Sequence, residues 1–309
     1  MNTQRERSTR GMIQARPYEF MVQYTPQREW VEKRGILLWL AFFFVELGAG
    51  MFIISSIFDI FAGMLIAWLI CATLGGGLHL LYIGRPLRIW RMLLSSGWKT
   101  SWISRGLYFI IIFLSLGLLH IVLVRRTTYI PTVMVVTNIF AFLTIIYGGF
   151  AMAFVNGIKL WNTPMVPILF TVAGIWGGVG LTIVTVLATG NTQVVPSLEM
   201  WSRIFLEGFT FLLIIYLVTI RYSGEAGRIS VRQIVTERWR TVFWVIVVGL
   251  GVVLPLIAIL SNWIGGFVIP PLLLYVLVLS ELLGDLSFRY CLLRCGYYSP
   301  LVPTTSYKY

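Results

Sequence analysis

Charge is scarce in this sequence of 309 residues: charged side chains make up 12% of it and hydrophobic ones 58%. A soluble globular domain has about a quarter of its residues charged, so the scarcity argues against that class. The charge present is mostly positive, with 24 Lys and Arg against 12 Asp and Glu. This excess does not indicate nucleic-acid binding, because the basic residues lie between long apolar runs, where they set membrane topology and attract anionic lipids.

Cysteine and histidine are also rare, with three and two copies. Cys71, Cys291 and Cys295 are too few for a disulfide framework, and their spacing fits no common metal site or iron–sulfur centre. His79 and His120 differ in depth by roughly 20 Å at helical rise, so they cannot ligate one haem. We therefore expect no metal, haem or iron–sulfur cluster in this chain, and packing roles for the cysteines and for His120.

Long apolar runs fill most of the sequence. Eight are long enough to cross a hydrocarbon core of ~30 Å, and helices are expected because a helix satisfies its own backbone groups in lipid. The expected spans are 35–58, 61–83, 103–124, 131–156, 165–189, 199–221, 240–262 and 267–290. The sequence thus predicts an all-α integral membrane protein with a polar, basic arm (1–34), a transmembrane domain (35–290) and a tail (291–309). The polar start of the arm is unlike a cleavable signal peptide.

The basic residues are distributed unevenly over the segments that join these spans. Only Arg125, Arg126 and Arg203 fall on one side, and the other 21 of the 24 Lys and Arg fall on the opposite side. Because loops rich in Lys and Arg stay in the cytoplasm, both termini are predicted to be cytoplasmic, in a cell (inner) membrane. The asymmetry also supports the count of eight spans, because one span more or fewer would distribute the basic residues over both sides of the membrane.

A few polar side chains interrupt the apolar spans. Most of them lie in the cytoplasmic half or near the midplane when residues are counted from the span ends. A charged group at the bilayer centre costs at least ~2.5–3.5 kcal/mol, so a set of them indicates a function or a shared water-filled cavity, although a single acid can simply bridge helices. The acids expected to pass protons are Glu46, Glu207, Glu281 and Asp285.

Residues 75–106 bring together the densest group of functional candidates. A glycine-rich apolar helix reaches His79, a Gly-Arg-Pro turn containing Arg85 ends it, and a basic loop leads into the next span at Trp102. Polar and basic groups collected at one membrane boundary are costly to place there, so we expect this corner to act on a ligand or a partner.

Three short motifs resemble those of the NrfD/PsrC-like family. Residues 79–86 (HLLYIGRP) resemble the family's H-L-x-x-L-G-R-P, and residues 161–164 (WNTP) match its W-N-T-P. Residues 147–149 (YGG) resemble its Y-[ST]-G, with Gly148 in place of the hydroxyl residue.

Two further segments extend the resemblance along the chain. Ser101-Trp102, with residues 104–106, resembles the segment that opens the third span of the family. Residues 281–285, with Arg289-Tyr290, resemble its final-span motif E-x-x-G…R-Y. The motifs follow one another in the family's order over nearly the whole chain, which makes the set specific.

The resemblance implies an eight-helix membrane subunit built as two four-helix bundles, with no cofactor of its own. Such a subunit exchanges electrons between the membrane quinone pool (menaquinone or ubiquinone) and an iron–sulfur partner subunit, beyond which lies a catalytic subunit of the oxidoreductase complex. The tyrosine of Y-[ST]-G is associated with the quinone site in this family, and that role carries over to Tyr147.

The residues themselves suggest how a quinone would be held. A quinone ring carries two carbonyls that become hydroxyls, so it needs hydrogen-bond donors and a source of protons. Tyr147 and His79 suit the donor roles, since a histidine titrates near neutral pH, and Arg85 at the lip can stabilise negative charge. Buried carboxyl groups can pass protons. The rim facing a partner is assigned to Arg88, Trp102, Arg105, Trp161 and Asn162.

Two other functions stay open from the sequence. The buried acids would also suit a proton-coupled solute transporter without a redox role. Transporters more often show inverted repeats and helices broken at matching positions, whereas only Pro255 interrupts a span deeply here. A structural anchor for a redox partner is the third possibility.

Overall fold

A computed structural model of the chain describes residues 19–94, 96–126, 130–266 and 269–302. Eight helical stretches within these residues are long and apolar enough to cross a membrane, which confirms the expected all-α membrane class. The last of them continues to Arg294, beyond the predicted end at residue 290. The eight stretches are Gly35–Ile57, Phe61–Ile83, Trp102–Arg125, Pro131–Ala153, Met165–Thr189, Thr192–Arg221, Val242–Gly265 and Pro271–Arg294.

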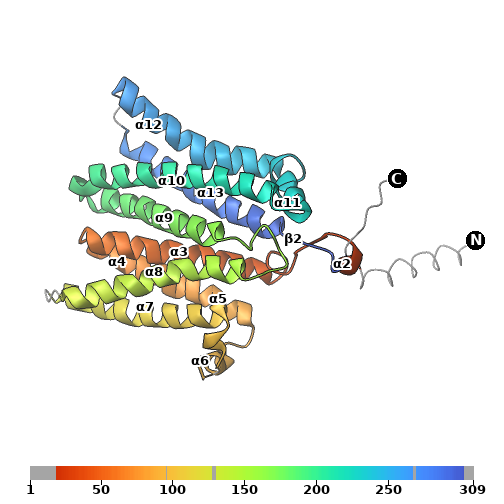
Figure 1. Cartoon of the computed structure of the whole chain (residues 1–309). Coiled ribbons are helices and arrows are strands. Elements are labelled where there is room, and N and C mark those ends of the chain that lie inside the picture. Colours follow the sequence, from red (N-terminus) through yellow and green to blue (C-terminus); the bar gives the residue numbers. More distant parts are fainter. Residues whose placement is uncertain (1–18, 95, 127–129, 267–268, 303–309) are drawn as a thin grey trace, which may run out of the picture.

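The spanning helices form two bundles that lie side by side (Figure 1). The N-terminal bundle contains α3 (Gly35–Ile57), α4 (Phe61–Leu69), η2 (Ile70–Gly76), α5 (Gly77–Ile83), α7 (Trp102–Arg125) and α8 (Pro131–Ala153). The C-terminal bundle contains α9 (Met165–Thr189), η5 (Thr192–Val194), α10 (Val195–Arg221), η6 (Val242–Val253), α12 (Leu254–Gly265) and α13 (Pro271–Arg294).

The two bundles meet where α3 packs against α9. A Cβ atom on Gly50 would collide with the carbonyl of Gly174, and one on Gly178 would collide with the backbone of Gly50 and Met51. Small residues allow this close approach, which is a common way to join helices in a membrane. Gly48 and Gly75 play the same part between α3 and the second span.

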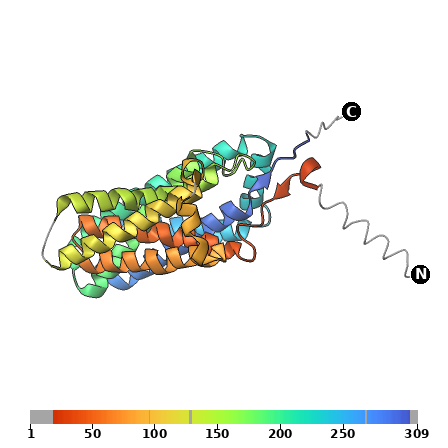
Figure 2. The same ribbon diagram turned by 90° about the horizontal axis from the view of Figure 1, so that it is seen from below.

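The elements outside the spans gather at one end of the molecule, on the right in Figures 1 and 2. Strand β1 pairs antiparallel with β2, so segments from the two ends of the chain meet there. We call this end the polar end, because the loops that carry most of the basic residues lie there. Its elements are α2 (Glu19–Val22), β1 (Thr25–Pro26), η3 (Pro86–Arg88), α6 (Trp90–Leu94), η4 (Ser96–Lys99), α11 (Glu225–Val235) and β2 (Tyr297–Tyr298).

Two spans contain wide π-helical turns, which the sequence analysis did not foresee. They are η2 in the second span and η6 in the seventh, where Pro255 follows directly. A π-turn adds a residue to the helical circuit and changes which side chains share a face beyond it, and such turns are frequent at functional sites. The interrupted spans are the second of one bundle and the third of the other, so the interruptions do not occupy matching positions.

Candidate functional site

Tyr147 of α8 and His79 of α5 contact each other directly inside the N-terminal bundle. The Tyr147 hydroxyl lies 2.6 Å from Nε2 of His79, and Nδ1 of His79 lies 2.9 Å from the carbonyl oxygen of Gly75. A carbonyl can only accept a hydrogen bond, so Nδ1 carries the hydrogen. In the neutral ring Nε2 then accepts, and Tyr147 is the donor. The two residues predicted as hydrogen-bonding partners of a ligand are thus adjacent.

Packing from three helices fixes this pair. A Cβ atom on Gly106 of α7 would collide with the Tyr147 ring, so only glycine leaves room for the tyrosine there. The Phe42 ring of α3 lies 5.5 Å from the His79 ring and 5.6 Å from the Tyr147 ring. Tyr147 is only 2% exposed, whereas His79 is half-buried. Part of the histidine surface therefore stays uncovered, whereas the tyrosine is enclosed.

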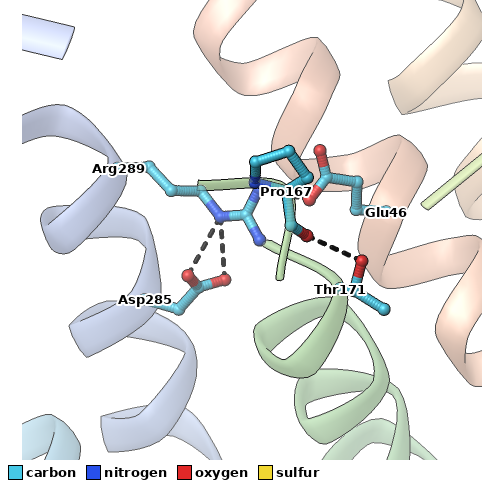
Figure 3. A network of polar contacts seen from close by, with 5 residues as sticks. All are labelled: Glu46, Pro167, Thr171, Asp285 and Arg289. Carbon is cyan, nitrogen blue, oxygen red and sulfur yellow. Dashed lines mark hydrogen bonds and ion pairs between the residues drawn. The ribbon is translucent and has the colours of Figure 1, made fainter. Parts of the chain in front are cut away.

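A buried ion network joins the two bundles beside this pair (Figure 3). Arg289 of α13 donates from Nε to both carboxylate oxygens of Asp285, at 2.9 and 3.0 Å, and from Nη1 to Oε2 of Glu46, at 2.5 Å. All three side chains are at most 8% exposed, and the guanidinium lies 4.4 Å from the centre of the Phe170 ring. With both carboxylates ionised the trio carries one net negative charge, so one shared proton would make it neutral, which burial favours.

Glu46 connects this network to the segment that carries Tyr147. Its Oε1 atom has no hydrogen-bond partner within the described residues, and a Cβ atom on Gly148 would collide with it. The Glu46 carboxylate thus occupies the space that a side chain at position 148 would need. This explains why glycine stands here in place of the hydroxyl residue of the Y-[ST]-G motif.

Glu281 lies apart from the network, in the C-terminal bundle. It is 6% exposed, and its Oε2 has no hydrogen-bond partner in the part of the chain that the structure describes. It borders a small cavity of about 40 Å³ that Glu199, Ser202 and Arg203 also line. A cavity of this volume has room for one or two water molecules, and the charged and polar groups that line it would be their partners. Arg203 contacts Glu199 at 3.5 Å there, so the cavity links Glu281 to charged groups near the end of the bundle opposite the polar end.

Glu207 does not belong to this group, although the sequence analysis grouped it with the acids expected to pass protons. It is exposed on the outer face of α10, whereas its neighbours Leu206 and Phe209 are buried. Successive residues on a helix point in different directions around its axis. A side chain at the same depth in the membrane as the buried acids can therefore still point out of the bundle.

The residues assigned to a partner-facing rim divide into three cases. Arg88 is exposed at the polar end, and so is Arg85, which the sequence analysis assigned to the quinone site and not to the rim. Trp102 stacks on Phe150 at 4.4 Å and lies under the Arg105 guanidinium, which donates to the carbonyls of Trp98 and Lys99. These two side chains therefore hold the loop that precedes α7.

Trp161 and Asn162 form the third case and stabilise a turn. Trp161 was predicted to face a partner, but it is fully buried, donates from its ring nitrogen to the carbonyl of Leu292 and packs against Trp30. Asn162 is half-buried and donates to the carbonyl of Ala153 at the end of α8.

The sequence analysis did not identify Arg289 as the centre of the ion network. It named this residue only as part of the final-span motif. The spacing of Asp285 and Arg289, four residues apart in one apolar helix, was a usable signal for an ion pair. The contact between Arg289 and Glu46 left no local signal, because it joins residues 243 positions apart. No group of three or more His, Cys, Asp or Glu lies close enough to hold a metal within the described ranges, and all three cysteines are buried and unpaired.

Eight spans, a buried tyrosine–histidine pair and an ion network between two bundles define a multi-pass membrane protein with an internal polar site. The sequence profile of the family described as "Polysulphide reductase, NrfD" matches residues 34–300, so the chain belongs to the NrfD family. Members of this family are membrane anchor subunits of quinone-linked redox complexes and associate with iron–sulfur and catalytic subunits.

One curated relative is the Protein NrfD homolog of Haemophilus influenzae (strain ATCC 51907 / DSM 11121 / KW20 / Rd). It is 24% identical over 119 residues, which make up 36% of this chain and 36% of the relative. The matched part thus spans about a third of that protein's length.

Proposed function

We propose that this chain binds quinone and exchanges electrons between the membrane quinone pool and an iron–sulfur subunit docked at its polar end, with a catalytic subunit beyond. The observation that carries the proposal is the Tyr147–His79 pair, in which the tyrosine is buried and the histidine is partly exposed. Family membership supports the same reading.

The chemistry of the pair fits a quinone ring. A quinone oxygen accepts a hydrogen bond and a quinol hydroxyl donates one, and a tyrosine or a histidine can serve either form. Tyr147 and His79 contact each other at 2.6 Å, so a quinone oxygen would replace one partner in this hydrogen bond. The Phe42 ring supplies an apolar wall next to both. A bound quinone would supply the redox chemistry, while these residues orient the ring and hold its protons.

The buried acids suit a proton route that accompanies this reaction. Glu46 lies between the Tyr147 segment and Arg289 and has one carboxylate oxygen free of hydrogen bonds within the described residues. The Asp285–Arg289 pair extends this group into the C-terminal bundle, where Glu281 adds a further buried carboxyl group next to a small cavity. We assign proton transfer to Glu46, Asp285 and Glu281.

The polar end is the docking face in this proposal. Arg85 and Arg88 are exposed there, and Trp102, Arg105 and Asn162 fix the adjoining loops. The excess of Lys and Arg on this side favours a cytoplasmic position under the positive-inside rule, so in this proposal the iron–sulfur partner is cytoplasmic.

The test is quinone-linked turnover of the complex purified from native membranes, with Tyr147→Phe and His79→Ala. We expect each to lower turnover by about 100-fold, as for loss of a proton-transferring group. Matched controls are Tyr216→Phe, which removes a buried hydroxyl bonded to Leu160 in the other bundle, and His120→Ala. Unchanged kinetics in both test variants would refute the site. Mass spectrometry of the same preparation should find an iron–sulfur protein and bound quinone.

A proton-coupled transporter is the second candidate, and the cavity beside Glu281 favours it. That function predicts uptake of a labelled solute by the isolated chain in liposomes, lost in Glu281→Gln. Absence of uptake together with quinone-dependent turnover in the complex would exclude it.

A further inference from the structure

A second polar site lies at the polar end, beside the C-terminal bundle. It is a pocket of about 310 Å³ between the β1–β2 ribbon, α11 and the end of α13. Residues from four separate segments line it, so it exists only in the folded chain. We call it the arginine pocket; the lining residues used below are Gln27, Arg28, Gln233, Arg238, Arg294 and Tyr297.

The pocket carries an excess of positive charge. Of its three arginines, Arg294 pairs with Glu32 at 2.5 Å. Arg28 and Arg238 have no acidic side chain within ion-pair distance in the ranges that the structure describes. The other nearby carboxylate, Glu237, is held by Arg232 at 2.6 Å. Two guanidinium groups therefore remain available to an anion, and guanidinium groups are well suited to bind phosphate oxygens in pairs.

Uncharged groups in the pocket add hydrogen-bonding capacity. Gln27 is 3% exposed and its backbone N–H donates to the carbonyl of Gly296 at 2.7 Å, yet its side-chain Oε1 has no partner among the described residues. Burial raises the pKa of the Tyr297 hydroxyl, which therefore stays protonated and can donate. The pocket thus offers donors to an anion, and Gln27 at its wall has an enclosed, unsatisfied acceptor that a rotation of its side chain would present to a hydroxyl group.

The position of the pocket indicates a ligand from the membrane surface. It lies where α13 ends at Arg294 and next to α11, an amphipathic helix that buries Val231 and Ile234 and exposes Arg228 and Arg232. The Arg238 guanidinium lies 5.7 Å from the centre of the Trp239 ring. Tryptophan and arginine side chains together are typical of the headgroup level of a bilayer.

We propose that the arginine pocket binds an anionic phospholipid whose headgroup combines a phosphate with a free hydroxyl, as in phosphatidylglycerol. Arg28 and Arg238 hold the phosphate, Tyr297 donates to it, and the Gln27 side chain accepts from the headgroup hydroxyl. Bound lipid would clamp the β1–β2 ribbon against α11.

The test uses native mass spectrometry and thermal unfolding of the full complex in detergent. Short-chain phosphatidylglycerol is the probe, and phosphatidylcholine and glycerol 3-phosphate are the comparisons. We expect phosphatidylglycerol to bind and to raise the unfolding temperature. The double variant Arg28→Gln/Arg238→Gln should weaken binding by about 10-fold or more, as expected for lost charged hydrogen bonds. The matched control is Arg221→Gln/Arg240→Gln, which removes two exposed charges at the same end outside the pocket.

A second variant tests the headgroup hydroxyl. Gln27→Leu should reduce the preference for phosphatidylglycerol over phosphatidic acid, which lacks that hydroxyl, while phosphate binding persists. Equal binding of phosphatidylglycerol by the wild type and the double variant would overturn the proposal. So would equal binding of phosphatidylcholine. If glycerol 3-phosphate bound as tightly as the lipid, the lipid source would be refuted. Loss of an iron–sulfur partner with unchanged lipid binding would assign the arginines to that partner instead.

Discussion

The two bundles of this protein have the same number of spans but handle polar groups differently. The N-terminal bundle holds a neutral hydrogen-bonded pair, Tyr147–His79, in which the histidine is partly exposed. The C-terminal bundle has a core of large aromatic residues, including Trp176, Phe209 and Phe288, and directs Arg289 out of that core to the interface. The difference suggests a division of labour in which one bundle binds the ligand and the other fixes the charges next to it.

Removing the charge at the interface should have the largest effect. Arg289→Leu leaves Glu46 and Asp285 buried without a counter-charge, and we expect it to destabilise the fold by ~3–5 kcal/mol. Arg294→Ala breaks an ion pair near the surface and should cost ~0–1 kcal/mol. Thermal unfolding in detergent measures both. A triple variant that adds Glu46→Gln and Asp285→Asn should recover part of the loss; equal effects of Arg289→Leu and Arg294→Ala would contradict the buried network.

The second prediction concerns the space around Tyr147. Gly106→Ala places a methyl group against the tyrosine ring and should displace it, lowering quinone-linked turnover by about 10–100-fold. Gly77→Ala is the matched control, because nothing lies within 4 Å of a Cβ atom there. That change should leave turnover intact and stabilise the helix by ~0.5–1 kcal/mol. Similar turnover in the two variants would show that quinone-linked turnover does not depend on the position of the Tyr147 ring.

The third prediction tests the link between the pair and the ion network. Gly148→Ser restores the hydroxyl residue of the motif but pushes on the Glu46 carboxylate, so we expect a loss of stability of ~1–3 kcal/mol. Gly208→Ala, which meets nothing within 4 Å, should be neutral or slightly stabilising. Combining Gly148→Ser with Glu46→Ala should relieve the collision. A single Gly148→Ser variant as stable as the wild type would show that Glu46 can move at little cost.

The smallest effect is expected for the acid on the outer face. Glu207→Gln should leave quinone-linked turnover and proton uptake unchanged, since this side chain points away from both bundles. Glu281→Gln, in the same bundle but buried, should slow proton uptake that accompanies turnover. Proton uptake by the complex in liposomes, followed with a pH-sensitive dye, distinguishes the two. A greater loss in Glu207→Gln would reverse the assignment.

The sequence was sufficient for what depends on local pattern. Apolar runs predicted eight spans because hydrocarbon thickness fixes the length of a helix, and short motifs pointed to Tyr147 and His79. The sequence was not sufficient for contacts between helices, because these depend on which faces of the helices meet. Glu207 was placed by depth alone, and the contact of Glu46 with Arg289 depends on the packing of α3 and α13. The π-turns η2 and η6 likewise have no distinct local signature.

The pairing of β1 with β2 has a consequence for biosynthesis. Thr25 and Pro26 pair with Tyr298 and Tyr297, so the ribbon cannot form until residue 298 has left the ribosome. All eight spans precede that point and can insert first. The β1–β2 ribbon therefore forms only after all eight of these spans have been synthesised. A stop codon shortly after Arg294 would release a protein that keeps these eight spans but lacks strand β2. The segment around residue 25 would then have no pairing partner, and its increased sensitivity to protease would show this.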